Sequence, residues 1–255
     1  MVRYEVSEGR VTITIDEPER RNPMSVATMR ALAAAARRAL DDSDVRVLVF
    51  TGAGDDAFSA GGDLAGGFVD DPIGLHRERG QLATLLRDLR RGGKPTVARV
   101  NGHALAGGFG LAVACDVTIC VEDVRLGVTE INVGLWPMMI TAVLASAMPR
   151  KAALELMMTG RIITPREALT LGAVSRVVSR DRLDDTVDEV VTALLAKSPL
   201  ILRLGRDAFS ATSDLGFDAA LDRLQGGLTA VASTEDSKEG VAAFVEKRPP
   251  RWQGR

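Results

Sequence analysis

Apolar and polar residues alternate at the start of the chain, MVRYEVSEGRVTITID, in the pattern of a β-hairpin with one buried face. Apolar side chains then recur at helical spacing from Val26 to Leu40, and Ser25 stands where it can cap that helix. The apolar run Val45–Phe50 predicts a short buried strand. Strand and helix patterns continue to alternate as far as residue 178, and only helical patterns remain after it.

The later segments extend this alternation into a complete core and a helical ending. They predict helices around 75–89, 106–114, 137–148, 165–172, 183–196, 199–210, 217–232 and 237–247, and strands at 96–100, 116–121 and 175–178. Thr164, Pro165 and Glu167 form a capping box with proline in the first helical position. We therefore predict a mixed α/β core over residues 1–195 and a helical C-terminal region over residues 196–255.

Composition and charge narrow the class of protein. Hydrophobic residues make up 46% and charged residues 26%, as in ordinary globular proteins. The 32 Lys and Arg nearly balance 34 Asp and Glu, and their signs are mixed along the chain, so we expect no nucleic-acid partner. We also expect no signal peptide and no membrane span, because no apolar run has the required length. A cytoplasmic location is the expectation.

Cysteine and histidine are too sparse for several common kinds of active site. Cys115 and Cys120 are predicted to be reduced, buried thiols, and His76 and His103 are too far apart for a zinc-binding helix. For His103, a packed or hydrogen-bonded structural role is favoured over that of a general base. The segment 108–110 lacks the third glycine of a dinucleotide fingerprint, which argues against a nicotinamide-dependent oxidoreductase.

Two glycine-rich segments, AFSAGGDL (57–64) and NGHALAGG (101–108), each follow a predicted strand. Glycines in such loops can simply allow tight turns and close packing. They also let a ligand approach the main chain, so two bare N–H groups can point at one oxygen atom. Such a pair, reinforced by the positive end of the helix that begins near Gly108, would form an oxyanion hole. Both interpretations remain open from the pattern alone.

These segments, extended to NGHALAGGFGLAVACD (101–116), closely resemble the signatures of the crotonase family, also called the enoyl-CoA hydratase/isomerase family. The similarity continues through TEINVGLWP (129–137), through residues 159–178 and into the ending at 239–252. The resemblance implies an α/β fold built as a spiral of β-β-α units, with a C-terminal helical trimerisation region and assembly as a homotrimer or homohexamer. It also implies acyl-CoA thioester substrates, no metal and no separate cofactor, since coenzyme A is part of the substrate.

The resemblance assigns roles to individual positions of this chain. The backbone amides of Gly62 and Gly107 match the pair that holds the thioester carbonyl oxygen, and Glu130 matches a catalytic glutamate. A carboxylate between Thr129 and Ile131 should be partly desolvated, which raises its pKa and suits it to move a proton near neutral pH. Three positions match the path of the CoA moiety: Ala60, Asp63 and Leu64. Arg20 and Lys247 are weaker candidates for contacts to the CoA phosphates.

Gly110 stands where two-carboxylate hydratases of this family carry their second glutamate. Moving a double bond needs one base, which takes a proton from C2 and returns it at C4, so isomerisation of a 3-enoyl-CoA to a 2-enoyl-CoA is favoured over hydration of a 2-enoyl-CoA. A second acid from Asp70, Asp71 or Glu78 would restore the case for hydration. A catalytically silent acyl-CoA-binding protein of the same fold is the alternative from a different functional class.

Overall fold

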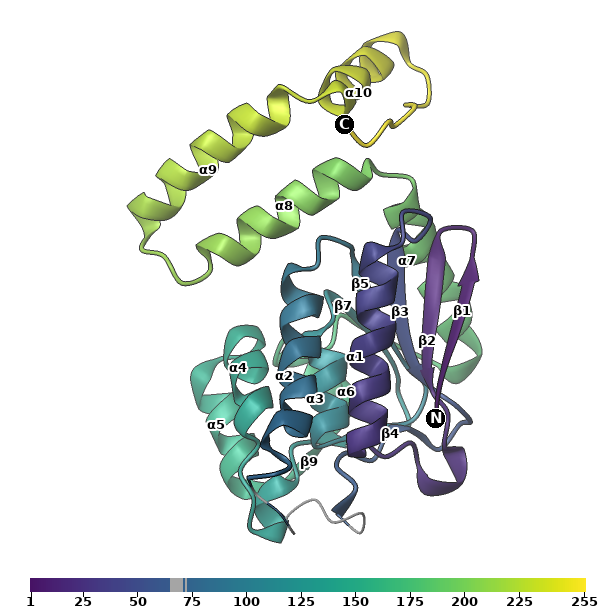
Figure 1. The fold of residues 1–255 in the computed structure, drawn as a ribbon, viewed down its shortest axis with the longest axis vertical. Helices are drawn as coiled ribbons and strands as arrows, with labels where there is room; N and C mark the ends of the chain where they lie inside the picture. Colours follow the sequence, from purple (N-terminus) through teal and green to yellow (C-terminus); the bar gives the residue numbers. More distant parts are fainter. Residues whose placement is uncertain (65–70, 72) are drawn as a thin grey trace.

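The computed structural model describes residues 1–64, 71 and 73–255, and its centre is a six-stranded sheet (Figure 1). The strands lie in the order β1-β2-β3-β5-β7-β10. β1 and β2 form the predicted antiparallel hairpin, and each later strand is parallel to its neighbour. The bounds are β1 Val2–Ser7, β2 Arg10–Ile15, β3 Val47–Gly52, β5 Thr96–Val100, β7 Val117–Val121 and β10 Arg176–Val178.

A second, four-stranded sheet has the order β4-β6-β8-β9. Its strands are β4 Ala57–Ser59, β6 His103–Leu105, β8 Leu126–Gly127 and β9 Ile162–Ile163. β4, β6 and β8 are parallel, whereas β9 is antiparallel to β8. The residue pattern predicts loops at 57–64 and 101–108, and that prediction is wrong where β4 and β6 lie. Strands of two or three residues are too short to show the alternation by which strands are recognised.

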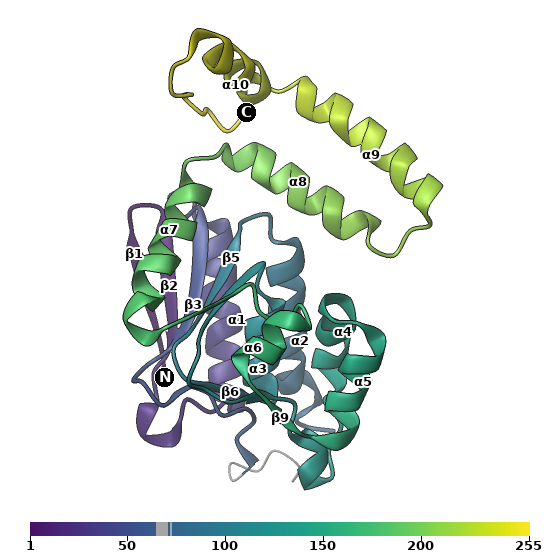
Figure 2. The same cartoon turned by 180° about the vertical axis from the view of Figure 1, so that it is seen from behind.

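The helices cover both faces of the larger sheet. α1 and α2 pack together on one face, and α7 contacts β3, β5 and β7 from the other (Figures 1 and 2). The α-helices are α1 Val26–Asp41, α2 His76–Arg91, α3 Gly107–Ala114, α4 Met138–Ala147, α5 Arg150–Thr159, α6 Pro165–Thr170, α7 Leu183–Leu195, α8 Pro199–Thr212, α9 Phe217–Ala232 and α10 Glu235–Glu246. The 3₁₀ turns are η1 Pro18–Arg20, η3 Glu130–Val133 and η4 Arg180–Arg182.

The predicted helix caps are confirmed. The hydroxyl of Ser25 accepts a hydrogen bond from the amide of Thr28 at 3.1 Å, which satisfies one free N–H group at the start of α1. The hydroxyl of Thr164 accepts from the amide of Glu167 at 3.2 Å, with Pro165 in the first position of α6. These short polar side chains fix where the helices begin, and so fix the entry of the chain into the core.

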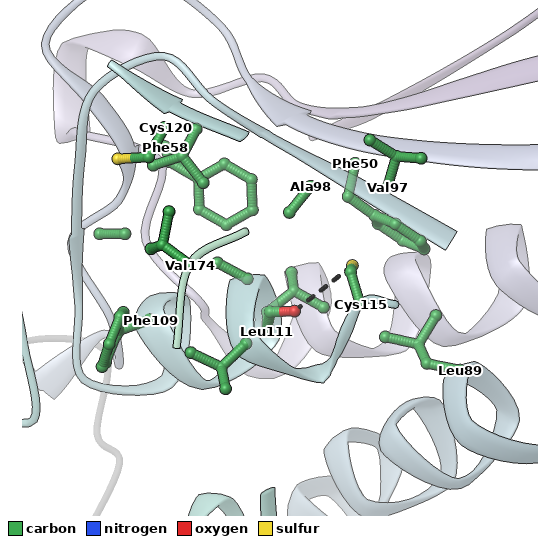
Figure 3. Packing of buried hydrophobic residues seen from close by; sticks show 14 of the residues in the cluster. Phe50, Phe58, Leu89, Val97, Ala98, Phe109, Leu111, Cys115, Cys120 and Val174 are labelled. Atoms are coloured by element: carbon green, nitrogen blue, oxygen red, sulfur yellow. Dashed lines mark hydrogen bonds between the residues drawn. The ribbon is translucent and has the colours of Figure 1, made fainter. Parts of the chain in front are cut away.

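The hydrophobic core lies between the sheets and the helices, and its largest fully buried side chains include three phenylalanines (Figure 3). Phe50, Phe58 and Phe109 are each at most 1% exposed. The Cys115 thiol donates to the carbonyl oxygen of Leu111 at 3.6 Å, and both cysteines are buried and free, as predicted (Figure 3). Burial raises the pKa of the Cys120 thiol to about 12 and that of Cys115 further, so both stay as unreactive thiols.

The C-terminal helices α8, α9 and α10 extend beyond one end of the larger sheet (Figures 1 and 2). α7 ends at Leu195, next to the predicted division at residues 195 and 196, although the division into two units stays a prediction. Several large apolar side chains on these helices face outward, including Phe209, Phe217, Leu228 and Phe244. A helical segment with this much exposed apolar surface is typical of an interface with another chain.

Candidate active site

The three residues to which catalytic roles were assigned follow three adjacent strands of the smaller sheet. Gly62 comes three positions after the end of β4, Gly107 two positions after the end of β6, and Glu130 three positions after the end of β8. β4, β6 and β8 are neighbours and parallel, so their carboxyl ends meet at one edge. Ligands of α/β proteins bind at such an edge. The topology therefore gathers the candidate residues, although they are far apart in the sequence.

Direct contacts join the loops that follow these strands. Gly61 has a φ of +88° and lies so close to the β6 loop that an added Cβ would be 2.6 Å from the Cβ of Ala106 and 2.9 Å from the carbonyl oxygen of Leu105. Only glycine combines this backbone conformation with this close approach. The amide of Ala106 in turn donates to the carbonyl oxygen of Gly127 at 2.8 Å. The loops after β4 and β6 and the end of β8 thus form one continuous unit.

Ala106 has an unusual backbone conformation, with φ of 50° and ψ of −127°. Such a conformation costs on the order of 1–3 kcal/mol for a residue with a side chain. It is held from both sides, because the amide of Ala106 donates to Gly127 and its carbonyl oxygen accepts from the amide of Gly110 at 3.0 Å. The ψ angle of Ala106 sets the plane of the peptide that contains the amide of Gly107. Backbone strain is therefore concentrated at the peptide whose N–H is the candidate donor.

The glycines of the two segments divide into packing positions and open positions. Gly61 and Gly108 are buried, whereas Gly107 is half-buried and Gly62 is exposed. A Cβ on Gly107 would meet only the Met24 sulfur, at an ordinary contact distance of 3.8 Å. No acceptor is found within residues 1–64, 71 and 73–255 for the amide hydrogen of Gly62 or of Gly107. Both open amides remain available to a ligand, as an oxyanion hole requires.

Glu130 begins the 3₁₀ turn η3 and is half-buried. Its Oε2 atom is buried and has no hydrogen-bond partner in the part of the chain that is described. Burial raises the pKa of this carboxyl group, because the charged form loses solvation. The turn itself is anchored: the side-chain amide of Asn132 donates to the carbonyl oxygen of Gly160 at 3.2 Å, and the amide of Leu135 donates to that of Glu130 at 3.1 Å. A desolvated carboxylate on a fixed turn is suited to exchange protons with a ligand.

The positions considered for a second carboxylate have surroundings that differ from those of Glu130. Gly110 is buried inside α3 and provides no side chain. An Asp71 carboxylate oxygen accepts from the amide of Gly74 at 2.9 Å, and Glu78 forms an exposed ion pair with Arg30. Asp70 lies outside the described residues. Ionic and turn-forming roles therefore account for Asp71 and Glu78.

The predicted CoA-binding positions lie next to the open amide of Gly62. The amide of Ala60 donates to the carbonyl oxygen of Arg21 at 2.9 Å, and the side chain of Leu64 is 47% exposed. The Asp63 carboxylate pairs with Arg20 at 2.7 Å. Arg20 thus contacts the loop after β4 that carries Ala60, Asp63 and Leu64.

Lys247 is not part of this cluster within one chain. It follows α10 at the exposed end of the helical extension, whereas β4 lies toward the opposite end of the molecule (Figure 1). The predicted structural role of His103 is confirmed, since its Nδ1 atom accepts from the amide of Arg125 at 2.9 Å.

Two residues near the open amides were missed from the sequence. Met24 is 2% exposed, its sulfur faces Gly107, and its amide donates to the carbonyl oxygen of Gly61 at 2.7 Å. Ala106 orients the Gly107 peptide. A lone methionine in a loop and an alanine among small residues carry no pattern, and only the backbone angles reveal the role of Ala106.

Within the described residues, no cluster of three or more His, Cys, Asp or Glu side chains is arranged to hold a metal ion. Among those same residues, each helix is too short or too polar to cross a lipid bilayer.

Comparison with known proteins gives a consistent result. A profile of the enoyl-CoA hydratase/isomerase family matches residues 5–255. A Thermus thermophilus protein provisionally named an enoyl-CoA hydratase is 37% identical over 254 residues, covering 97% of this chain and 99% of the relative. A carnitinyl-CoA dehydratase of Salmonella enteritidis is 34% identical and covers 95% of this chain and 94% of its own.

Solved structures agree with the sequence relatives. The enoyl-CoA hydratase of Mycobacterium smegmatis superimposes with a TM-score of 0.93 at 30% identity, covering 98% of both chains. That of Bacillus anthracis gives a TM-score of 0.94 at 28% identity, covering 100% of this chain and 99% of the other. The predicted fold class, a crotonase-like spiral of β-β-α units, is confirmed. The chain belongs to the enoyl-CoA hydratase/isomerase family.

Proposed function

We propose that this protein acts on acyl-CoA thioesters, binding the thioester carbonyl oxygen with the amides of Gly62 and Gly107 and moving a proton with Glu130. The two amides lie on loops that are in contact, and neither donates to an acceptor in the described part of the chain. Glu130 follows the next strand of the same sheet. This arrangement supplies the two elements that enolate chemistry needs, a polarised carbonyl group and a base.

The favoured reaction is the isomerisation of a 3-enoyl-CoA to a 2-enoyl-CoA. Glu130 takes a proton from C2, and the electrons of that C–H bond delocalise through the double bond and onto the carbonyl oxygen. The two amides and the N-terminus of α3 stabilise the negative charge on that oxygen. Each donor of this kind is worth about 2.7–4 kcal/mol in the transition state. Glu130 then returns the proton at C4, and the double bond moves into conjugation with the thioester.

The observation that carries this proposal is the Oε2 atom of Glu130, which is buried on an anchored turn and has no hydrogen-bond partner among residues 1–64, 71 and 73–255. An unsatisfied buried carboxylate oxygen is destabilising, so its presence calls for a functional reason. Burial shifts the pKa of Glu130 upward, toward neutral pH, and such a pKa suits a group that both takes and returns a proton. Gly110 contributes no second acid, and isomerisation needs only one carboxylate for both steps.

Hydration of a 2-enoyl-CoA is the second candidate, and the names of the relatives favour it. The sequence relatives include an enoyl-CoA hydratase and a carnitinyl-CoA dehydratase, and both names describe addition or removal of water. In this chain the reaction would need an acid in addition to Glu130. Ala60, Asp63 and Leu64 are proposed to contact the CoA moiety in either case.

We also propose that the active assembly is a homotrimer or homohexamer. The exposed apolar side chains of α8, α9 and α10 supply a surface for a second copy of the chain. Such an assembly could also bring Lys247 of one copy to the CoA phosphates of another.

Product identification tests the function. The protein is incubated with 3-enoyl- and 2-enoyl-CoA esters of several chain lengths, and the products are separated and identified by mass and retention. We expect 2-enoyl-CoA from the 3-enoyl ester, and a loss of turnover on the order of 10²–10⁴-fold in Glu130→Gln. Full turnover in Glu130→Gln would exclude the mechanism. Calorimetric binding of CoA esters without conversion would instead indicate a catalytically silent binding protein.

A further inference from the structure

Gly110 lies at a point of α3 that is closed by the neighbouring helix α4. Gly110 is buried, and a Cβ placed on it would lie 2.7 Å from the Cβ of Ile140 and 3.2 Å from its Cδ1, and closer still to its Cγ2. Non-bonded carbon atoms pack at about 3.5–4.0 Å. Ile140 is only 2% exposed and has little room to move aside. The side chain of Ile140 therefore fills the volume that any side chain at position 110 would enter.

At Gly107, three residues earlier in α3, there is room for a side-chain methyl group. A Cβ on Gly107 would meet only the Met24 sulfur at 3.8 Å, whereas the three nearest atoms at Gly110 all belong to Ile140. One side chain of α4 is thus responsible for closing this position. α3 thus has an open amide at its first residue and, three residues later, a position closed by Ile140. The resemblance to two-carboxylate hydratases assigns their second glutamate to that closed position.

We infer that Ile140 determines the outcome of the reaction, an inference that rests on the proposed enolate chemistry. Hydration requires the oxygen of a water molecule to bond to C3 while a carboxylate takes a proton from that water and C2 gains a proton. Gly110 and Ile140 together exclude a carboxylate from the place beside α3 that could accept the proton of water. The proton held by Glu130 then returns to carbon at C4, and the product is the isomer.

The test combines two substitutions, one that adds a carboxylate at position 110 and one that removes the side chain of Ile140. Gly110→Glu alone cannot be accommodated, because its side chain would overlap that of Ile140. Ile140→Ala would not remove the overlap, since the alanine Cβ would still lie 2.7 Å from the Cβ of the new glutamate. The second substitution is therefore Ile140→Gly. The test protein carries Gly110→Glu with Ile140→Gly. The matched control carries Gly110→Glu with Leu144→Gly, which removes another fully buried aliphatic side chain of α4. Both are checked for folding by circular dichroism before assay.

The readout is the product formed from 2-enoyl-CoA and from 3-enoyl-CoA in the same preparation. We expect the test protein to form 3-hydroxyacyl-CoA from 2-enoyl-CoA on the order of 10²-fold faster than the wild type, Ile140→Gly alone or a folded preparation of the Leu144 control. The inference would be overturned if a folded test protein gained no hydratase activity. It would also be overturned if the wild type hydrated 2-enoyl-CoA as fast as the test protein does. Failure of the proposed function is separate, because it is read from wild-type isomerisation and its dependence on Glu130.

A second variant decides the question if the test protein does not fold. Ile140→Gly alone leaves a space beside Gly110 in which a small carboxylate such as formate can take the place of the side chain. We expect added formate to stimulate hydration of 2-enoyl-CoA by Ile140→Gly and not by Leu144→Gly. Equal responses of the two variants, or no response from either, would contradict a role of Ile140 in choosing the product.

Discussion

Gly107 and Gly108 are neighbours in sequence, and the structure predicts opposite consequences when each is replaced by alanine. The added methyl group at Gly107 would lie 3.8 Å from the Met24 sulfur, in ordinary contact. At Gly108 it would lie 2.6 Å from Cβ, 2.7 Å from the carbonyl oxygen and 2.8 Å from Oγ of Ser59. Ser59 is fully buried in β4, so its backbone cannot yield without moving that strand.

The magnitudes decide the sign in each case. Replacing glycine by alanine within a helix gains roughly 0.5–1 kcal/mol of stability. Overpacking of a buried site costs roughly 1–3 kcal/mol. Gly107→Ala should therefore fold at least as stably as the wild type, whereas Gly108→Ala should be less stable. Since 1 kcal/mol corresponds to roughly 2–4 °C in a protein of this size, the two melting temperatures should differ by several degrees.

Gly107→Ala should lose activity although its stability is retained. Its methyl group enters the open space beside the free amide, so the thioester oxygen can no longer approach that donor. Loss of one donor of an oxyanion hole lowers turnover by about 10²–10³-fold. Thermal denaturation followed by circular dichroism and turnover of 3-enoyl-CoA measure the two effects separately. A fully active Gly107→Ala, or a Gly108→Ala that melts at the wild-type temperature, would refute the assignment of an open and a packed glycine.

Three further predictions concern the base, the core and the helical extension. Because burial raises the pKa of Glu130 above 4.5, the folded protein binds that proton more tightly than the unfolded chain does, and stability falls as pH rises through the interval between the two pKa values. Glu130→Gln should therefore melt above the wild type at neutral pH and together with it below pH 4; an unchanged difference across that range would contradict this. The buried Asn101 side chain bonds to Thr51, Gly52 and Gly54, so Asn101→Ala should cost about 3 kcal/mol or more in denaturant unfolding, and a loss below 1 kcal/mol would be inconsistent. Phe244 is 85% exposed on α10, and Phe244→Asp should reduce the assembly to smaller species in light scattering; an unchanged mass would argue against that face as an interface.

The larger sheet and its helices could be predicted from the sequence because their patterns are long. The strand Val45–Phe50 and the helix from Val26 to Leu40 correspond to β3 and α1 within two residues at each end. Their apolar spacing reflects burial of a whole face. The caps at Ser25 and Thr164 are local interactions between residues three apart, so the sequence alone contains what is needed to find them.

The smaller sheet could not be predicted, although it carries the candidate site. β8 and β9 have two residues each, and their pairing depends on contacts between segments far apart in the chain. Glu130, Gly62 and Gly107 were found through resemblance, while Ala106 and Ile140 were not. Strain at Ala106 is visible only as a pair of backbone angles, and the packing of Ile140 against Gly110 joins two helices.

The structure of a complex with a saturated acyl-CoA, which cannot be isomerised, tests the central claim most directly. We expect the thioester carbonyl oxygen to lie at hydrogen-bonding distance, about 2.7–3.1 Å, from the amide nitrogens of both Gly62 and Gly107. We also expect a carboxylate oxygen of Glu130 to face C2 of the acyl chain. A carbonyl oxygen bound away from either amide, or a Glu130 carboxylate directed away from the acyl chain, would contradict the account.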